Sequence, residues 1–383
     1  MERATLPLKV VLGQPSWRLA SPRVEAYVTQ TGGHVGPVTF DRRGSKIKPL
    51  SVAPWATERI DHSQPPVIRA LRGDFFCLPF GGNSLPYRNE EHPAHGETAN
   101  GKWKLQSFAN RPGEMPTLHL RLQTRVRPGC VDKYISLATD HDAIYQRHVV
   151  SGMSGPMSFG HHAMLRFPDE TGAGIVSTSR FVYGQVFPEP MERPESRGYS
   201  ILEPGAEFET LSEVPTLTGE TADLSRYPAR RGYEDLVTLV SDDSMPFAWT
   251  AVTFRKQRYA WFALKDPRVL RSTIFWISNG GRHYPPWNGR HVNVMGLEEV
   301  TSYFHPGLAE SVAENPISKR GYPTHAQLNP NRPLVVNYIF GVTAVPVGFE
   351  RVDTIEAADG GVILRSGRIS VRVPIDVPFL TAG

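Results

Sequence analysis

Histidine and carboxylate side chains cluster in a few short segments of this chain, at residues 92–97, 158–168, 231–239 and 278–300. His, Asp and Glu are the side chains that most often transfer protons in catalysis, and the same groups bind metal ions. The spacing within each segment decides which of these two kinds of chemistry it can support.

The segment His92-Pro-Ala-His-Gly-Glu97 begins the stretch HPAHGETANGKW. A metal site would need its two histidines and its glutamate to converge, but Pro93 and Gly96 disfavour a helix. In a strand only His95 and Glu97 share a face, because alternate residues point to opposite sides. Three interpretations remain open. They are a sugar-binding loop, which the dense Gly, Pro and aromatic content favours, a structural turn, and a metal site formed by His92, His95 and Glu97.

Two adjacent histidines lie in the segment 158–168. If this segment is a strand, His161 shares a largely apolar face with Phe159 and Leu165, whereas His162 lies on the more polar face. We therefore predict that His162 faces an open side, where it could act on a substrate. We expect His161 to be a core histidine that bonds to the backbone.

The other two segments each contain a pair of neighbouring carboxylates. Glu234 and Asp235 lead from a turn into a strand, and they could be no more than a solvated strand entrance. Glu298 and Glu299 end an apolar strand, where neighbours point in opposite directions, so one of them could be enclosed and have a raised pKa. The alternation of side chains does not show which of the two glutamates is enclosed. The structural alternative to a catalytic role is that one of them pairs with a nearby arginine.

Alternation of apolar and polar residues is the main structural pattern of the sequence. In residues 118–126 the apolar Leu118, Leu120 and Leu122 alternate with polar side chains, and residues 368–373 repeat the pattern. Further strand candidates, separated by Gly, Pro, Asn and Asp clusters, are 23–29, 38–41, 134–138, 247–254, 259–264, 272–277 and 334–340. No long helical period occurs, and residues 309–314 are expected to form one short helical turn at most.

These patterns predict an all-β fold of two large, mainly antiparallel sheets packed face to face. We expect residues 1–383 to form a single domain. The alternative is a split into two domains near residues 190–230, where Pro188, Pro190, Pro194 and Pro204 cluster.

Composition excludes several classes of function. The net charge of +4 is a small surplus without a basic stripe, so nucleic acid is not an expected partner. No apolar run of ~18 residues and no leader-like start are visible, so we expect a cytoplasmic protein without membrane association. Cys77 and Cys130 match no metal or redox spacing and are expected to be buried without a disulfide. The sequence does not indicate an oligomeric state.

Taken in order, the segments resemble motifs of the galactose mutarotase-like superfamily, the aldose 1-epimerases and their relatives. The motifs are collinear and run from residue 79 to residue 298. They are Pro79-Phe-Gly-Gly-Asn83, Pro93-Ala-His-Gly96 with Trp103, Gly160-His-His162, Gly232-Tyr-Glu-Asp235 and Gly296-Leu-Glu298. This resemblance implies a galactose mutarotase-like β-supersandwich with a carbohydrate cleft on one sheet.

The resemblance also implies a reaction and its residues. A base takes the proton of the anomeric hydroxyl, an acid protonates the ring oxygen, and the opened sugar closes on its other face. Glu298 would be the base, with Glu299 as the alternative. His162 would be the acid, with His161 as the alternative. His95 would hold the ring oxygen or a neighbouring hydroxyl, and Asp235 would bind hydroxyls. A small sugar is therefore the expected ligand, with no metal or cofactor.

Other substrate contacts follow from this comparison or from residue chemistry. Asn83 belongs to the first motif, but Ser84 follows it where many relatives have arginine, so Arg88 or Arg72 would replace that arginine. The Tyr-Glu-Asp turn leaves open whether Asp235 or Glu234 binds the sugar hydroxyls. Trp287 is a candidate contact on residue chemistry alone, because an indole face suits the C–H face of a sugar.

Two other functions fit the sequence. One is a metal-dependent sugar lyase or isomerase that uses His92, His95 and Glu97. The other is a non-catalytic carbohydrate-binding protein that binds glycans through the loop from Arg282 to His291.

Overall fold

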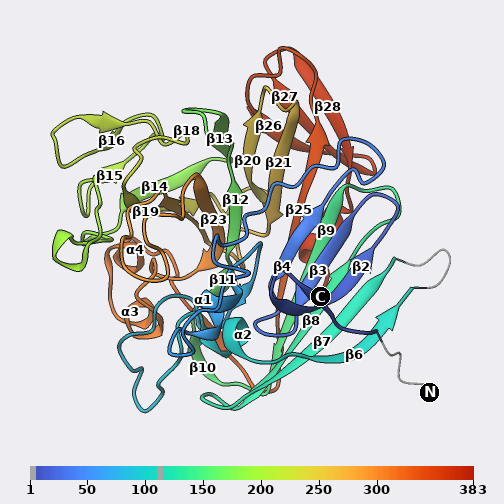
Figure 1. The fold of residues 1–383 in the computed structure, drawn as a ribbon, viewed down its shortest axis with the longest axis horizontal. Coiled ribbons are helices and arrows are strands. Elements are labelled where there is room, and N and C mark those ends of the chain that lie inside the picture. Colours follow the sequence, from blue (N-terminus) through green and yellow to red (C-terminus); the bar gives the residue numbers. More distant parts are fainter. Residues whose placement is uncertain (1–5, 111–114) are drawn as a thin grey trace.

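Two large antiparallel sheets form the centre of the protein (Figure 1). The computed structural model describes residues 6–110 and 115–383. The eight-stranded sheet contains, in spatial order, β15 (Glu207–Phe208), β14 (Phe181–Val186), β19 (Glu234–Ser241), β22 (Ser272–Ser278), β23 (Val294–Thr301), β11 (Phe159–His161) and β5 (Phe76–Cys77), and β12 (Ala163–Arg166) also pairs with β23. The nine-stranded sheet contains β18 (Arg226–Tyr227), β13 (Gly174–Thr178), β20 (Ala248–Phe254), β21 (Tyr259–Lys265), β25 (Leu334–Ala344), β9 (Ala143–Ser151), β8 (Gly129–Ser136), β7 (Thr117–Thr124) and β6 (Lys104–Ala109).

The central strands of both sheets are covered on both faces. Every residue of β19, β20, β21, β22 and β23 is buried. Their inner faces meet in one apolar cluster that includes Val237, Phe275 and Leu297 of one sheet and Trp261 and Phe340 of the other. Because apolar residues occupy both faces, these strands are almost continuously hydrophobic, whereas β7 near the sheet edge alternates.

Smaller elements surround the two sheets. Among the described residues, the other strands are β1 (Lys9–Val11), β2 (Gln14–Ala20), β3 (Glu25–Thr29), β4 (Val35–Thr39), β10 (Gly155–Met157), β16 (Val214–Pro215), β17 (Thr221–Ala222), β24 (Ala326–Leu328), β26 (Thr354–Ala358), β27 (Gly361–Ser366) and β28 (Ile369–Pro374). The helices are short: α1 (Pro66–Ala70), α2 (Gly96–Asn100), α3 (Leu308–Val312), α4 (Pro316–Lys319), and the 3-10 turns η1 (Pro194–Ser196) and η2 (Val377–Thr381).

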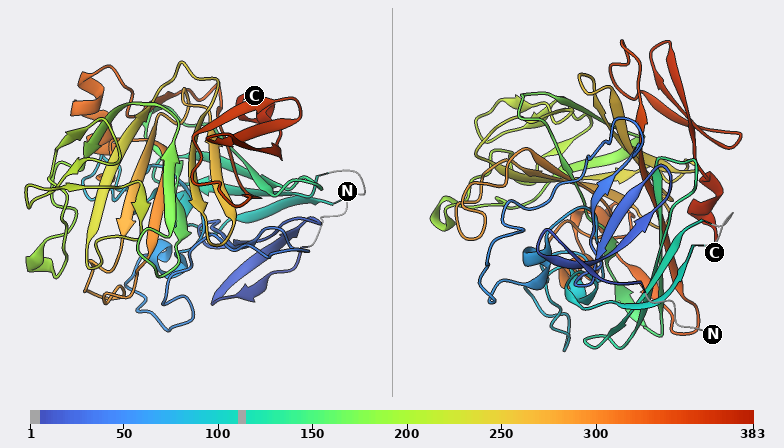
Figure 2. Two further views of the ribbon diagram at one scale, coloured as in Figure 1. Left: turned by 90° about the horizontal axis from the view of Figure 1, so that it is seen from above. Right: turned by 45° about the vertical axis from the view of Figure 1, so that its right-hand side comes forward.

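The C-terminal strands β26 to β28 lie on the opposite side of the molecule from α3 and α4 (Figure 2). Ile355, Leu364 and Val373 from these strands join a second apolar cluster with Phe262 and Ile339. This cluster covers the outer face of the nine-stranded sheet. The outer face of the eight-stranded sheet is instead covered by α1 and by loops, and it contains the site described below.

The predicted all-β, two-sheet architecture is confirmed. The alternation in residues 118–126 marks β7, with Leu118, Leu120 and Leu122 inside. Each of the strand candidates named above corresponds to a strand, and the expected short turn is α3. Strand β9, which is central to the nine-stranded sheet, was not predicted. No helix in the described ranges is both long and apolar enough to cross a membrane.

The proline-rich stretch near residues 190–230 contributes to both sheets, because β15 pairs with β14 and β18 pairs with β13. Since one apolar cluster also joins the two sheets, we propose that they form the expected single domain. Cys77 is buried as expected, whereas Cys130 is partly exposed, and both thiols are free.

Candidate functional site

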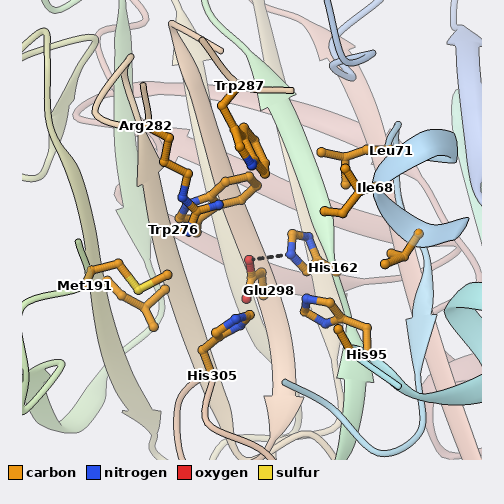
Figure 3. A pocket seen from close by; sticks show the side chains of 13 residues that line it. Ile68, Leu71, His95, His162, Met191, Trp276, Arg282, Trp287, Glu298 and His305 are labelled. Atoms are coloured by element: carbon orange, nitrogen blue, oxygen red, sulfur yellow. Dashed lines mark ion pairs between the residues drawn. The ribbon is translucent and has the colours of Figure 1, made fainter. Parts of the chain in front are cut away.

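A cavity of about 120 Å³ lies on the outer face of the eight-stranded sheet (Figure 3). Strand parity places Leu236 of β19, Trp276 of β22 and Glu298 of β23 on this face, because Leu236 is opposite Trp276 and Ile274 is opposite Glu298. The residues that line the cavity are Val67, Ile68, Leu71, Ala94, His95, His162, Met191, Leu236, Trp276, Arg282, Trp287, Glu298 and His305.

The structure separates the two neighbouring glutamates of β23. Glu299 points between the sheets, where Lys265 donates to it and the hydroxyls of Thr250 and Thr273 each donate at 2.7 Å. Glu298 points into the cavity and is only 2% exposed. Gly296, two residues earlier on the same face, leaves the space for this carboxylate, since a Cβ there would lie 2.6 Å from Glu298 Oε1.

Glu298 is paired with His162, whose Nε2 lies 3.1 Å from Glu298 Oε1. The short break between β11 and β12 turns His162 towards the cavity, and the ring stacks on Phe75 with centroids 4.6 Å apart. Burial raises the pKa of Glu298 well above its ordinary value and lowers the pKa of His162 to about 3. Both shifts have the same cause, because an enclosed site penalises the charged form of each group.

Two further histidines face the same cavity. His95 lies at the start of α2, with its Nδ1 3.4 Å from Cys77 Sγ, and its ring centroid is 5.0 Å from that of His162. His305 lies 5.2 Å from His95, measured between ring centroids. Burial lowers the pKa of His95 well below its ordinary value and that of His305 to about 4, so all three rings are neutral near pH 7.

Asn83 ties together the loops that carry these histidines. Its Nδ2 donates to the carbonyls of Gly81 at 3.0 Å and Pro93 at 3.2 Å, and its Oδ1 accepts from the backbone N–H of Leu308 at 3.0 Å. The backbone N–H of His95 also donates to Gly81 O. Asn83 therefore positions His95 and His305, although the resemblance placed it in contact with substrate.

Replacing Asn83 with Ala is expected to destabilise the protein by about 2 kcal/mol or more, because buried hydrogen-bonding groups that lose their partner cost about 1–3 kcal/mol. The residue also has a φ of 52°, which Ala tolerates less well than Asn. Denaturant unfolding measures the loss. Asn288→Ala is the matched control, because Asn288 has a φ of 48° but is exposed. Equal losses of stability in the two variants would show that the hydrogen bonds of Asn83 do not hold the two loops together.

Arg282 and two tryptophans form the other end of the cavity. The guanidinium carbon lies 4.6 Å from the ring centroid of Trp287 and 5.4 Å from that of Trp276, within the range of cation–π attraction. Arg282 Nε donates to Glu192 Oε1 at 2.5 Å, and the hydroxyl of Tyr284 donates to the same oxygen. The positive charge of Arg282 is therefore already paired with a carboxylate.

Glu234, not Asp235, lies on the face that contains the cavity. Glu234 accepts from Trp276 Nε1 at 3.0 Å and from the Ser278 hydroxyl at 2.9 Å, and burial raises its pKa to about 7. It therefore fixes the indole ring of Trp276. Asp235 points the other way, and its Oδ1 accepts from the backbone N–H groups of Ile201 and Leu202 at 3.0 Å. The implied role of Asp235 in binding hydroxyls does not fit this position.

Three other residues with an expected substrate role lie outside the cavity. Arg88 is exposed and lies over the ring of Tyr87. Arg72 is buried and donates to the backbone carbonyls of Ala70, Val11 and Leu12. His161 points between the sheets, and its Nδ1 lies 3.0 Å from Asp74 Oδ2. It is a core residue, as parity predicted, but its partner is a carboxylate instead of the backbone.

The trio His92, His95 and Glu97 does not converge. His92 Nε2 bonds to Glu90 at 2.9 Å, and Glu97 accepts from the backbone N–H groups of residues 125 and 126. Only His95 faces the cavity. Within the described ranges no group of three or more His, Cys, Asp or Glu side chains is arranged to hold a metal ion. The alternative interpretation of His92, His95 and Glu97 as one metal site therefore does not fit the structure.

The sequence singled out five cavity residues: His95, His162, Arg282, Trp287 and Glu298. It missed His305, Trp276, Met191 and the role of Glu192. His305 and Glu192 come from irregular loops, where no periodicity indicates direction. Trp276 could have been placed by parity with Glu298, once the pairing of β22 with β23 was known.

No protein-family model matches the chain, and no significant match was found among curated proteins. Solved structures do match. A provisionally assigned aldose 1-epimerase from Escherichia coli K12 is 14% identical, with a TM-score of 0.58 over 87% of this chain and 100% of its own. A galactose mutarotase-like protein from Clostridium acetobutylicum is 11% identical, with a TM-score of 0.59 over 88% and 98%. A galactose mutarotase related enzyme from Lactobacillus acidophilus is 10% identical, with a TM-score of 0.54 over 86% and 98%. The chain therefore has the galactose mutarotase-like fold, at very low sequence identity.

Proposed function

We propose that this protein is an enzyme of the aldose 1-epimerase type, which interconverts the anomers of a small sugar by acid/base ring opening. The observation that carries the proposal is the pair Glu298 and His162, buried at 3.1 Å from each other in a cavity on the sheet. A carboxyl and an imidazole with perturbed pKa values in an enclosed cavity are suited to positioned proton transfer. The galactose mutarotase-like fold supports the same reaction class.

The proton inventory of the pair suits this reaction. Because burial disfavours both charged forms, the pair holds one proton, carried by Glu298 in the resting state. Ring opening requires Glu298 to accept the anomeric proton and His162 to donate one to the ring oxygen. The productive form is thus the tautomer in which His162 carries the shared proton. The 3.1 Å approach of His162 Nε2 to Glu298 Oε1 lets that proton move from carboxyl to imidazole before ring opening. Ring closure reverses both transfers, because Glu298 returns a proton to the anomeric oxygen and His162 takes one from the hydroxyl that closes the ring, so the pair is restored after each turnover.

The histidines and tryptophans support substrate orientation. His95 and His305 flank the pair and offer ring nitrogens to sugar hydroxyls, as Figure 3 shows from their positions below Glu298. Trp276 and Trp287, above the pair, offer apolar faces to the C–H groups of a sugar ring. Exclusion of water by the surrounding apolar residues strengthens the polar contacts inside.

Anomer exchange tests the proposal directly. The protein is added to freshly dissolved α-anomers of a panel of aldoses, and the relaxation of optical rotation is compared with the spontaneous rate in buffer. Saturation transfer between the two anomeric proton signals gives the rate at equilibrium. Acceleration for at least one aldose is expected. Binding of sugars by calorimetry without any acceleration would instead favour the non-catalytic alternative.

Arg282→Gln is expected to move the alkaline limb of the pH profile of kcat/KM to higher pH. This limb reports loss of the shared proton, mainly from Glu298, and the charge of Arg282 lowers the pKa of Glu298 against the larger effect of burial. Removing that charge raises the pKa further, so the one-proton form persists to higher pH. Arg290→Gln is the control, because Arg290 pairs with the exposed Glu58. A shift of the alkaline limb to lower pH in Arg282→Gln would contradict the assignment of this limb to Glu298.

A further inference from the structure

The cavity has two chemically different sides (Figure 3). Four of its polar side chains, those of His95, His162, Glu298 and His305, gather at one end, and Arg282 lies at the other end. An apolar wall beside them is formed by Ile68 of α1 and by Leu71, and Met191 lies across the cavity from this wall. Ile68, Leu71, Met191 and Leu236 carry no group that can donate or accept a strong hydrogen bond.

The backbone beside this apolar side is also occupied. Trp55 Nε1 donates to the carbonyl of Ile68 at 2.8 Å, and the backbone N–H of Leu71 bonds to the same carbonyl. Asp235, the carboxylate that could have bound hydroxyls from the sheet, points away and is engaged by backbone N–H groups. A sugar hydroxyl placed against these side chains would lose its bonds to water without replacement.

Charge selects the substrate as well. Arg282, the cation that lines the cavity, is already paired with Glu192 and lies 4.0 Å from Glu234, measured between Nε and Oε2. An anionic group in the cavity would have to compete with these carboxyls for the guanidinium, so a phosphate or a carboxylate on the sugar is disfavoured.

We infer that the substrate is a neutral deoxy sugar, whose methyl or other apolar substituent packs against Ile68 and Leu71 while the anomeric centre lies at Glu298. This inference rests on the proposed function for the position of the anomeric centre. The preference itself arises from binding, because a methyl group gains from this surface and a hydroxymethyl group loses a hydrogen bond there.

Calorimetric titration with matched sugar pairs tests the inference without requiring turnover. The pairs are L-fucose with L-galactose, L-rhamnose with L-mannose, and 6-deoxy-D-glucose with D-glucose, each differing in one hydroxyl group. At least one 6-deoxy sugar is expected to bind on the order of 10-fold more tightly than its partner, the scale of a single group in an apolar pocket. D-Galacturonate and D-glucose 6-phosphate are expected to bind more weakly than either.

Two substitutions test whether the apolar wall of the cavity causes the preference for deoxy sugars. Ile68→Gln adds a hydrogen-bonding group at the cavity and is expected to reduce the deoxy-to-hydroxy affinity ratio several-fold. Ile60→Gln is the matched control, because Ile60 packs against the same apolar cluster but does not line the cavity, and it should leave the ratio unchanged. Tighter binding of the hydroxylated or anionic sugars, or an unchanged ratio in Ile68→Gln, would overturn the inference.

Failure of the proposed function would appear differently. If the deoxy sugars bind as expected but their anomer exchange is not accelerated, the substrate class stands and the epimerase reaction is wrong. If exchange is accelerated for hydroxylated sugars and the deoxy sugars neither bind better nor react faster, the reaction stands and the substrate class is wrong.

Discussion

Replacing Glu298 with Gln lowers kcat/KM for anomer exchange by about 10²–10⁴-fold, the usual contribution of a positioned proton-transfer group. Gln keeps the shape of the side chain but cannot accept the anomeric proton. Stability should not fall, because burial raises the pKa of Glu298 and so already favours its neutral form, and the amide of Gln is neutral as well. The two measurements are the relaxation of optical rotation and the midpoint of thermal unfolding. Glu58→Gln, at an exposed carboxylate, is the control for the loss of a negative charge.

His162→Asn extends the same experiment to the partner group. Because Glu298 and His162 share one proton, either substitution disables the pair, and the double variant should lose little more than either single variant. Losses that multiply in the double variant would show that the two groups act independently. Retention of activity by either single variant would contradict the assignment of the pair.

The sequence predicted the fold where the periodicity of a strand is visible on one face. Residues 118–126 alternate because β7 lies near a sheet edge with one face solvated. Strands β19 to β23 are apolar on both faces, so their length and type were readable but not the direction of each side chain. That is why Glu298 and Glu299 could not be distinguished until the second sheet, with Lys265, was placed against one of them.

The positions of the loops that form the site could not be predicted from the sequence, for a different reason. His95 and His305 are more than two hundred residues apart and meet only because Asn83 bonds to both of their loops. Such a clamp depends on three backbone groups whose positions no local pattern encodes. Motif order located His95 and His162, but it also assigned Asn83 and Asp235 to substrate, since a motif records which residues are present and not where they point.

Gly296 provides a test of how tightly Glu298 must be held. Its absent side chain is what leaves room for the carboxylate, because a Cβ at this position would lie 2.6 Å from Glu298 Oε1 and 3.1 Å from Trp276 Cβ. Gly296→Ala is therefore expected to push the carboxylate away from His162 and to lower kcat for anomer exchange by about 10²-fold, the effect of a misplacement near 1 Å. Calorimetric binding of the sugar should change much less than kcat.

A double-mutant cycle distinguishes displacement of Glu298 from general damage to the cavity. If Gly296→Ala acts through Glu298, adding it to Glu298→Gln causes little further loss, because the group that it displaces is already inactive. Damage transmitted through Trp276 would instead lower sugar affinity in both backgrounds and reduce activity additively. A Gly296→Ala protein that keeps full kcat would show that the carboxylate has space to move within the cavity. The 3.1 Å contact with His162 would then not be the geometry on which catalysis depends.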